Sequence, residues 1–379
     1  MPTDLVVVFT LSMLFTWFGQ AFPSRARNAL DKRKPNLIGL VIPALVMILY
    51  SGLRNNIGDT IYYVHTYHLL EDSGAVMPVW GQKAYLFELI QYWFIKSGLE
   101  YSSFIMLSAI VTIVPFMLVF YNYSVDYSLA IYLFFTMGIY VSTMNGIRQY
   151  IATGIILLGT KYLLTPKKSD FWKLLILVLT ASFIHDSALI MIPIYFLCRR
   201  KAWSAPTFIS LSVGVVGLML VSMFLPSFLG MLENTNYAGY ADGWFTDGKE
   251  TGTGLIRILF NCLPTILAAI FSKQIRRFGP IADILINISL VHSAIYLLAA
   301  YNWIFARFTF YTYAYVVLLM AMIFVAVLRS GKYRFLAIVM FIAYAVFFII
   351  DARSQRINWY ASDFFTPHNE MWFKFLYLD

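Results

Sequence analysis

Long apolar runs recur from one end of the chain to the other, and short polar stretches separate them. A helix needs roughly 20 mostly apolar residues to cross a bilayer. The pattern therefore predicts an all-α, polytopic membrane protein with about twelve transmembrane helices. We expect these helices near residues 4–22, 37–53, 102–121, 128–144, 147–164, 170–184, 187–198, 204–229, 254–272, 281–301, 308–328 and 335–350.

Two stretches depart from this pattern. Residues 84–98, AYLFELIQYWFIKSG, are short for a crossing and carry Glu88 and Gln91, so we interpret them as an amphipathic helix at the membrane interface. The polar segment 230–253 is the longest loop expected outside the membrane. No other stretch resembles a soluble domain, so we expect one membrane domain over residues 1–379.

The composition excludes an ordinary soluble protein, because 60% of the residues are hydrophobic and only 12% are charged. The first apolar run, from Leu5 to Phe22, lacks a preceding basic region and a small-residue cleavage site. We interpret it as a retained helix rather than a signal peptide. Cys198 and Cys262 lie in apolar context without the spacing of metal ligands. No nucleotide-binding or metal-binding motif occurs, and we expect no cofactor.

Basic residues gather in a few short loops, and this asymmetry predicts the topology. With the N-terminus outside and twelve crossings, the loops assigned to the cytoplasm hold eighteen of the 28 Lys and Arg. Both termini then lie outside, and the net charge of +9 reflects topology rather than binding to nucleic acid. These basic residues are Arg25, Arg27, Lys32, Arg33, Lys34, Lys161, Lys167, Lys168, Lys173, Arg199, Arg200, Lys201, Lys273, Arg276, Arg277, Arg329, Lys332 and Arg334.

The polar motifs fall on the outer side in this topology. The first, GLRNNIGDTIYYVHTY at residues 52–67, follows an apolar helix and contains Arg54, Asp59 and Tyr62. One interpretation is an interfacial belt, in which Arg54 reaches lipid phosphate and the tyrosines lie at headgroup level. The other is an anion clamp, in which Arg54 grips a phosphate and Asp59 holds the arginine or acts as an acid or base.

The second motif, NGIRQY at residues 145–150, places Arg148 at a predicted helix start, with Asn145 as the candidate cap. An arginine at a helix N-terminus opposes the helix dipole, which makes it a poor structural choice. A bound anion would be favoured by the helix end and by the arginine together. We therefore expect Arg148 to bind an anion.

The third motif is the pair His185 and Asp186, which lies between two apolar runs. A lone histidine in a loop is more often structural. The position of His185 on the same side as the arginines favours a general-base or phosphate-contact role. His292 lies in the middle of a predicted helix, and we expect it to form an interhelical hydrogen bond instead.

Arg307 starts another predicted helix from the outer side. Few carboxylates lie at that level to balance three arginines, so a polyanion such as a lipid-borne diphosphate would explain them. The loop 230–254 adds glycines, aromatic rings and acids, among them Asp242 and Trp244. It is either a glycan-binding lid or an ordinary solvated loop.

The order of four motifs resembles the EpsG family of Wzy-like polymerases of bacterial surface polysaccharides. The motifs are GLRxxxGDxxxY, NGIRQ, FIHxSAL and RFxxY, and they cover most of residues 50–315. The resemblance implies an integral glycosyltransferase of the bacterial plasma membrane that works on its outer face. Its donor and acceptor would both be oligosaccharide repeat units on undecaprenyl diphosphate, with no metal or nucleotide sugar. The products of such enzymes include O-antigen, exopolysaccharide and capsule, and a chain-length regulator protein is an expected partner beside the membrane lipids.

The resemblance also implies roles for single residues. His185 matches the family's histidine, and we expect it to deprotonate the acceptor hydroxyl or to help place it, with Asp59 as the second choice. Asp186 is a departure that we do not match to a role. The arginines expected to bind the diphosphate and to stabilise the leaving group are Arg54, Arg148 and Arg307. The residues expected to bind the glycan are Asn145, Gln149, Tyr62, Trp244 and Asp242.

Three alternatives share parts of this pattern. A lipid-linked oligosaccharide flippase would bind the same diphosphate, but it should show internal repeats and charges near the bilayer midplane. A membrane O-acyltransferase would use a histidine with a donor arriving from the cytoplasm. An O-antigen ligase would use similar arginine and histidine chemistry on a different acceptor.

Overall fold

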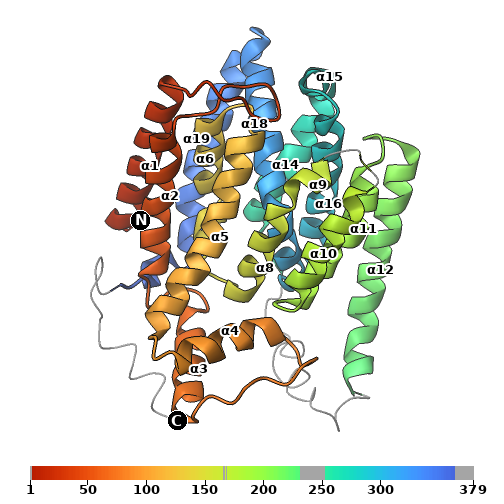
Figure 1. Cartoon of the computed structure of the whole chain (residues 1–379). Coiled ribbons are helices and arrows are strands. Elements are labelled where there is room, and N and C mark those ends of the chain that lie inside the picture. The colour runs from red at the N-terminus through yellow and green to blue at the C-terminus, as the bar shows by residue number, and fades with distance from the viewer. Residues whose placement is uncertain (1, 165–166, 168, 231–251, 363–379) are drawn as a thin grey trace. The chain divides into compact units, whose positions relative to one another are not determined.

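The computed structural model describes residues 2–164, 167, 169–230 and 252–362 (Figure 1). Helices and turns account for nearly all of this part of the chain, and it contains no β-strand. The predicted all-α fold is therefore confirmed. The predicted outer loop at residues 230–253 falls almost wholly outside the described residues.

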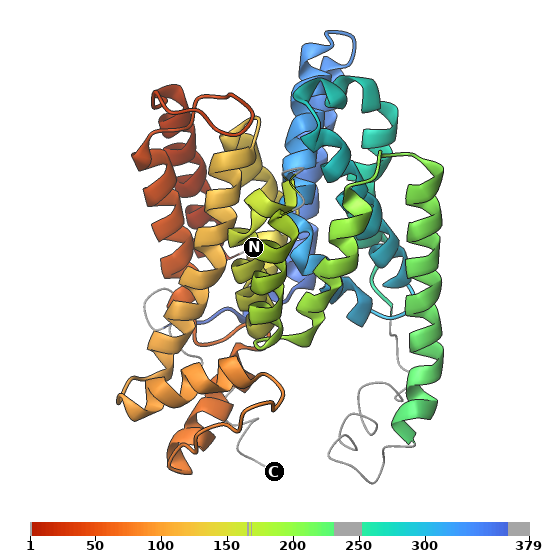
Figure 2. The same cartoon turned by 45° about the vertical axis from the view of Figure 1, so that its right-hand side comes forward.

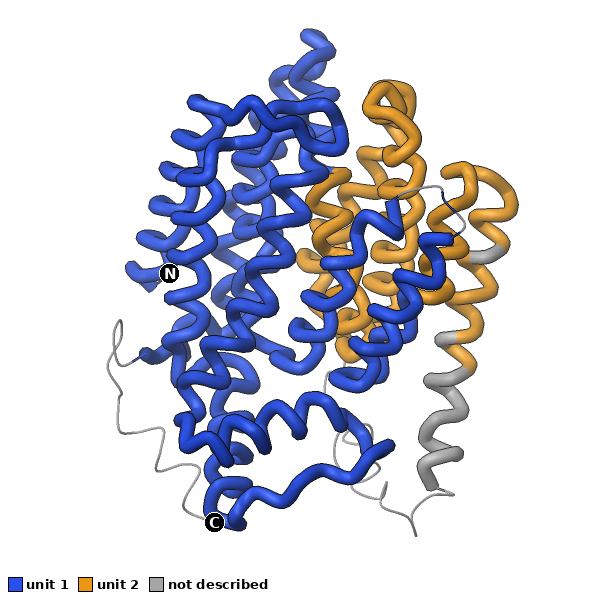
Figure 3. The backbone as a smooth tube through the Cα atoms, in the orientation of Figure 1, with its two compact units in different colours: residues 1–191, 320–379 blue, residues 192–319 orange. Residues whose placement is uncertain are grey.

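The chain divides into two compact units, residues 1–191 with 320–379 and residues 192–319 (Figure 3). A single membrane domain over residues 1–379 stays a prediction. The helices of the first unit are α1 (Thr3–Ala21), α2 (Leu37–Gly52), α3 (Thr60–Asp72), α4 (Tyr85–Lys96), α5 (Tyr101–Tyr123), α6 (Tyr127–Thr136), α7 (Ile139–Ser142), α8 (Ile147–Leu158), α9 (Thr160–Leu164), α10 (Asp170–Ser182), η1 (Asp186–Ile190), α19 (Arg334–Ser354) and η4 (Ile357–Trp359).

Small residues let the helices of the first unit approach closely. Gly19 of α1 faces Gly39 of α2, and a side chain at either position would collide with the opposite backbone. Gly154 of α8 lies against the backbone of α5 in the same way. Aromatic contacts join α6 to α19, where the Tyr132 ring stacks on Phe341 at 4.0 Å between centroids.

Two helices of the first unit, α3 and α4, lie together near one end of it (Figures 1 and 2). Helix α4 is the helix predicted for residues 84–98. It has 12 residues, which is shorter than a crossing requires, and its location at the membrane interface stays a prediction. Helix α3 was not predicted, because the polar and tyrosine-rich sequence of residues 60–72 lacks an apolar stripe.

The helices of the second unit are α11 (Met191–Cys198), α12 (Ala205–Gly230), α14 (Leu255–Ile270), α15 (Ser272–Ile275), η2 (Arg276–Phe278), α16 (Ile281–Leu298), α17 (Ile304–Arg307), η3 (Phe308–Tyr311) and the first part of α18 (Tyr313–Arg329). His292 of α16 lies within hydrogen-bond distance of Asn261 on α14 and of Thr312. The predicted interhelical role of His292 is therefore confirmed.

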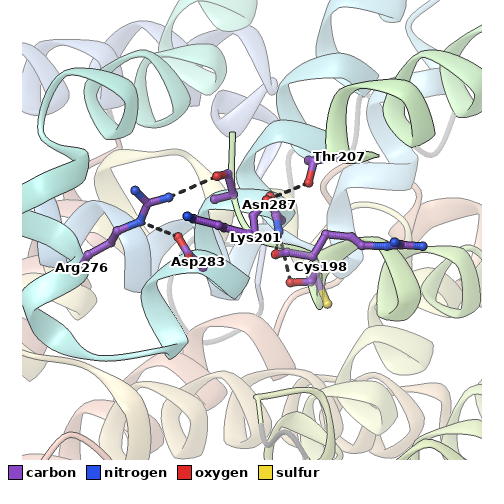
Figure 4. A network of polar contacts seen from close by, with 8 residues as sticks. Cys198, Lys201, Thr207, Arg276, Asp283 and Asn287 are labelled. Carbon is purple, nitrogen blue, oxygen red and sulfur yellow. Dashed lines mark hydrogen bonds and ion pairs between the residues drawn. The ribbon is translucent and has the colours of Figure 1, made fainter. Parts of the chain in front are cut away.

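A polar network in the second unit holds two basic loops together (Figure 4). The buried amide of Asn287 donates to the carbonyls of Cys198 and Arg200. Arg276 donates to the carbonyl of Ala202 and to Asp283. These loops were predicted to lie on one side of the membrane, and their contact is consistent with that topology. Their cytoplasmic location stays a prediction.

The number of crossings is not confirmed. Among the described residues, four helices are long and apolar enough to span a membrane: α1, α5, α16 and α19. Counting two strongly bent helix pairs as one span each raises the number to six. Several predicted spans are interrupted, as between α6 and α7 at Gly138 and between α8 and α9 at Gly159. The apolar runs predicted the positions of the helices better than their lengths.

Candidate functional site

Three of the predicted motifs meet at one end of the first unit, where α2 ends, α8 begins and α10 ends. The loop after α2 meets the start of α8 through one short hydrogen bond. The carboxylate of Asp59 accepts it from the backbone N–H of Gly146 at 2.8 Å. Gly58 has φ +58°, and a Cβ on it would lie 2.8 Å from the Cβ of Asn145. Gly58 and Asp59 of the first motif therefore pack closely against Asn145 and Gly146 of the second.

Arg148 is the second residue of α8, as predicted, and its side chain is half-buried. Its Nε donates to the hydroxyl of Tyr63 at 3.0 Å. Its guanidinium also lies over the rings of Tyr63 and Phe87, 5.9 and 5.7 Å from their centroids. The aromatic contacts hold the guanidinium at the helix N-terminus, where an anion would complement both. Tyr62, which was predicted to bind glycan, is 61% exposed, whereas its neighbour Tyr63 forms the contact with Arg148.

A hydrogen-bonded chain links the start of α8 to the predicted histidine. The amide of Gln149 donates to the hydroxyl of Ser187 at 3.1 Å, and this hydroxyl lies 2.7 Å from Nδ1 of His185. The backbone N–H of Ser187 also donates to Nδ1. Since an N–H can only donate, Nδ1 is an acceptor, and the neutral ring carries its proton on Nε2. Asp186, next along the chain, is exposed.

Arg54 has a different environment, because it is only 3% exposed. Its guanidinium donates to the hydroxyls of Thr60 and Ser51, each at 2.9 Å, and to the Ser51 carbonyl. Burial lowers the pKa of Arg54 to about 10, while the nearby Asp59 raises it, so the side chain stays charged at neutral pH. The interfacial interpretation required Arg54 to reach lipid phosphate. The side chain is instead enclosed by protein.

A segment near the C-terminus covers this buried arginine. The backbone N–H groups of Asn55 and Asn56 donate to the carbonyl of Ala361, at 2.9 and 3.4 Å. The ring of Tyr360 stacks on Tyr50 with 4.1 Å between centroids, and its hydroxyl donates to the Tyr50 carbonyl. The loop of the first motif and the segment after α19 were predicted to lie on the same side of the membrane, and their pairing is consistent with this.

Helix α4 reaches the same end of the unit and brings residues that sequence reasoning did not assign to the site. The N–H of Leu86 donates to the carbonyl of Phe183 at 3.0 Å, two residues before His185. Glu88 accepts a hydrogen bond from Gln82 and lies near enough to Arg148 for the two charges to interact.

The ionisation of Glu88 reflects these surroundings. Burial raises the pKa of Glu88, and the contacts with Gln82 and Arg148 lower it in part. The sequence carried a signal for this residue, because Glu88 and Gln91 interrupt the apolar face of the helix. Polar residues of that kind also suit an interfacial helix, so the signal did not separate a site from an interface.

The remaining predicted site residues are Asn145, Arg307, Asp242 and Trp244. Asn145 is exposed beside Gly58, and its predicted capping role is wrong, because the N-cap of α8 is Gly146 and no side chain caps this helix. Arg307 belongs to the second unit, where its guanidinium lies 5.1 Å from the ring centroid of Trp303. Asp242 and Trp244 lie outside the described residues. Within the part of the chain that the structure describes, no three His, Cys, Asp or Glu side chains are grouped so that they could hold a metal ion.

The apolar helices define the class of this protein as a multi-pass membrane protein. Its polar candidate site, which contains arginines, lies at the ends of these helices. The model of the EpsG family matches residues 37–369, and the chain belongs to this family of Wzy-like polysaccharide polymerases. The predicted resemblance is thus confirmed. Comparisons with curated proteins and with solved structures gave no match.

Proposed function

We propose that this protein polymerises oligosaccharide repeat units carried on a polyprenyl diphosphate, at the outer face of the bacterial plasma membrane. The family supports a polysaccharide polymerase of glycosyltransferase type. The observation that carries the proposal is Arg148, a half-buried cation held by two aromatic rings at the N-terminus of α8. Such a site favours an anionic group such as a diphosphate.

Arg148 would serve the leaving group. As the bond from the anomeric carbon to the diphosphate breaks, negative charge grows on the diphosphate oxygen. A fixed guanidinium lowers the barrier most where water is partly excluded. Arg54 is enclosed, so we assign it a structural role: it stabilises the loop that holds Asp59 against α8. Arg307 keeps its proposed diphosphate role as a prediction.

His185 would place the substrate. Its Nδ1 accepts from Ser187, which puts the proton of the neutral ring on Nε2, and the ring would donate from Nε2 to a sugar or phosphate oxygen of the substrate. Gln149 fixes Ser187 and thereby the ring. The family resemblance implies two roles for His185, to deprotonate the acceptor hydroxyl or to help place it. This arrangement favours the second role.

The function can be tested by deleting the gene and restoring it with wild type, Arg148→Ala or His185→Ala. The surface polysaccharide is then separated by size. We expect the deletion to leave single repeat units, wild type to restore the ladder, and neither variant to restore it at equal protein level. Arg27→Ala and His68→Ala are matched controls, because both side chains are exposed and lie outside the cluster.

Other outcomes separate the alternatives. Loss of all surface glycan, single units included, would favour the flippase. A normal ladder on the lipid carrier that fails to reach its final acceptor would favour a ligase. A ladder of normal length that lacks acyl groups would favour the acyltransferase.

The outer location of the site needs its own test. In a background with Cys198 and Cys262 replaced by serine, the exposed Asn145 is changed to cysteine and probed in spheroplasts with a membrane-impermeant maleimide. We expect labelling of Asn145→Cys without permeabilisation and labelling of Lys332→Cys only after it. The reverse result would place the site on the cytoplasmic side and would contradict the proposed reaction.

A further inference from the structure

Helix α4 brings a carboxyl group to the site that the proposed roles leave unused, that of Glu88. Two contacts fix the helix there. The N–H of Leu86 donates to the carbonyl of Phe183, in the loop that carries His185. The ring of Phe87 lies 5.5 Å from that of Tyr63 and 5.7 Å from the Arg148 guanidinium. Glu88 follows these two α4 residues directly, so its backbone is fixed between the histidine loop and Arg148.

The other candidates for a general base are engaged in holding the fold. Nδ1 of His185 accepts hydrogen bonds from Ser187, which leaves Nε2 protonated in the neutral ring. Asp59 accepts the backbone N–H of Gly146 at the start of α8. A base must have a lone pair directed at the substrate proton. The Nδ1 lone pair of His185 is used by Ser187, and the carboxylate of Asp59 binds the backbone through Oδ2 while its Oδ1 is buried. The carboxylate of Glu88 instead accepts from a flexible side-chain amide, that of Gln82, which can move aside for a substrate.

We propose that Glu88 is the general base that activates the acceptor sugar hydroxyl, an inference that rests on the proposed polymerase function. The hydroxyl oxygen attacks the anomeric carbon of the donor and forms the new glycosidic bond. The bond from that carbon to the diphosphate oxygen breaks, and the lipid diphosphate leaves with the electron pair beside Arg148. The hydroxyl proton passes to the carboxylate of Glu88, which later releases it to water. No oxidant, metal or further reactant takes part.

The surroundings of Glu88 suit this role. Its pKa is raised by burial, which makes the carboxylate a stronger base than an exposed one. Arg148 opposes this shift in part, because its positive charge favours the ionised carboxylate. The same positive charge is adjacent to both the proton acceptor and the leaving group.

Gln91 is a second polar residue of α4 with a buried side chain. It lies one turn beyond Glu88 on α4 and is only 3% exposed, and its amide nitrogen has no hydrogen-bond partner among the described residues. A buried amide without a partner is costly, and such groups are usually satisfied by water or ligand.

The test uses the full-length protein in nanodiscs. The substrate is lipid-linked repeat units extracted from the source strain after deletion of the gene. We expect Glu88→Gln, which keeps size and hydrogen bonding, to lower kcat by roughly 100-fold or more with little change in KM, as for loss of a general base. Glu88→Asp should retain part of the rate, and formate should restore part of the activity of Glu88→Ala. Glu71→Gln, an exposed acid on α3, is the matched control and should keep the full rate.

Each other outcome overturns a distinct statement. If Glu88→Gln keeps a rate within about threefold of wild type, or formate rescues nothing in a folded Glu88→Ala, Glu88 is not the base. If KM rises while kcat is unchanged, Glu88 only binds the glycan, and the inference fails while the polymerase remains. If wild-type protein elongates no chain from these units, the proposed function itself fails, and the role of Glu88 fails with it.

Discussion

Two arginines at the same end of the first unit have opposite environments. Arg54 is almost completely buried and donates to Ser51 and Thr60 beneath the segment that contains Tyr360. Arg148 is half-buried, rests on two aromatic rings and donates to one phenol. Each lies at a helix end, so the sequence pattern alone does not separate them. The difference in burial is the reason for proposing that Arg54 stabilises the loop and that Arg148 binds a ligand.

Hydrogen bonds made by side chains link these two regions. Arg54 holds Thr60, the neighbouring Asp59 binds the backbone of Gly146, and α8 then presents Arg148. A defect in the buried region should therefore disturb the site as a whole. A defect at Arg148 should affect the ligand and leave the fold intact.

The largest effect is expected from Arg54→Ala. It removes a buried guanidinium and leaves the hydroxyl and carbonyl groups around it unsatisfied, which costs about 3–5 kcal/mol when a buried charged partner is lost. We expect little folded protein and a much lower Tm for what remains. Both can be followed by fluorescence-detected size exclusion and by thermal unfolding in detergent.

Arg27→Ala, an exposed arginine in the same unit, is the control and should change neither quantity. If Arg54→Ala folds normally but loses polymer synthesis, Arg54 acts on the substrate. The assignment of a structural role to Arg54 and a ligand role to Arg148 would then be wrong. The result would support the diphosphate-binding role predicted for Arg54 from the sequence.

Arg148→Ala should show the opposite pattern. Removing one fixed group that stabilises developing charge typically lowers the rate by roughly 10²–10³-fold, or about 3 kcal/mol. We expect this loss in turnover of lipid-linked repeat units, with a Tm close to wild type because the side chain is only half-buried. Arg148→Lys keeps the charge but not the flat group on the rings, so it should recover only part of the rate. A large fall in Tm with unaltered turnover per folded molecule would show that Arg148 is structural.

The amino-acid sequence predicted much of this arrangement but not all of it. The apolar runs located the helices, and the positive charge at the start of α8 marked Arg148 as a candidate anion-binding residue. Burial of Arg54 could not be predicted, because it depends on Tyr360 and Ala361, about 300 residues away along the chain. Helix α3 was missed because its sequence has no apolar periodicity. The helix is held instead by contacts of its tyrosines with α8 and with residues in and just before α5.

Gly58→Ala tests the joint between the two regions. The residue has φ +58°, which is unfavourable for alanine, and the new Cβ would lie 2.8 Å from the Cβ of Asn145. We expect a loss of about 2 kcal/mol in stability from backbone strain and crowding together. Activity should fall as well, because Asp59 and Gly146 would separate. Gly74→Ala is the control, because that glycine also has positive φ but has no neighbour within 4 Å. Equal effects of both changes would mean that backbone strain alone matters and that the fit to Asn145 does not.

The smallest effect is expected from Glu88→Gln on the stability of the protein. The direction of this effect with pH follows from the shift in the pKa of Glu88. Burial raises the folded-state pKa of Glu88 above its value in the unfolded chain, even though Gln82 and Arg148 oppose the shift. Its contribution to stability is therefore fully present below the unfolded pKa and is lost as pH rises through the folded one. Since glutamine does not ionise, Glu88→Gln should be slightly more stable than wild type at neutral pH, and this difference should vanish in acid.

The measurement is Tm against pH for wild type, Glu88→Gln and Glu71→Gln. Glu71 pairs with His68 on the surface, so its replacement should show no such gain at neutral pH. A variant that is more stable and yet inactive would be typical of a residue kept for chemistry rather than for folding. If Glu88→Gln is instead less stable at neutral pH, the carboxylate strengthens the fold through Arg148. Glu88 would then resemble Arg54 rather than Arg148 in its role.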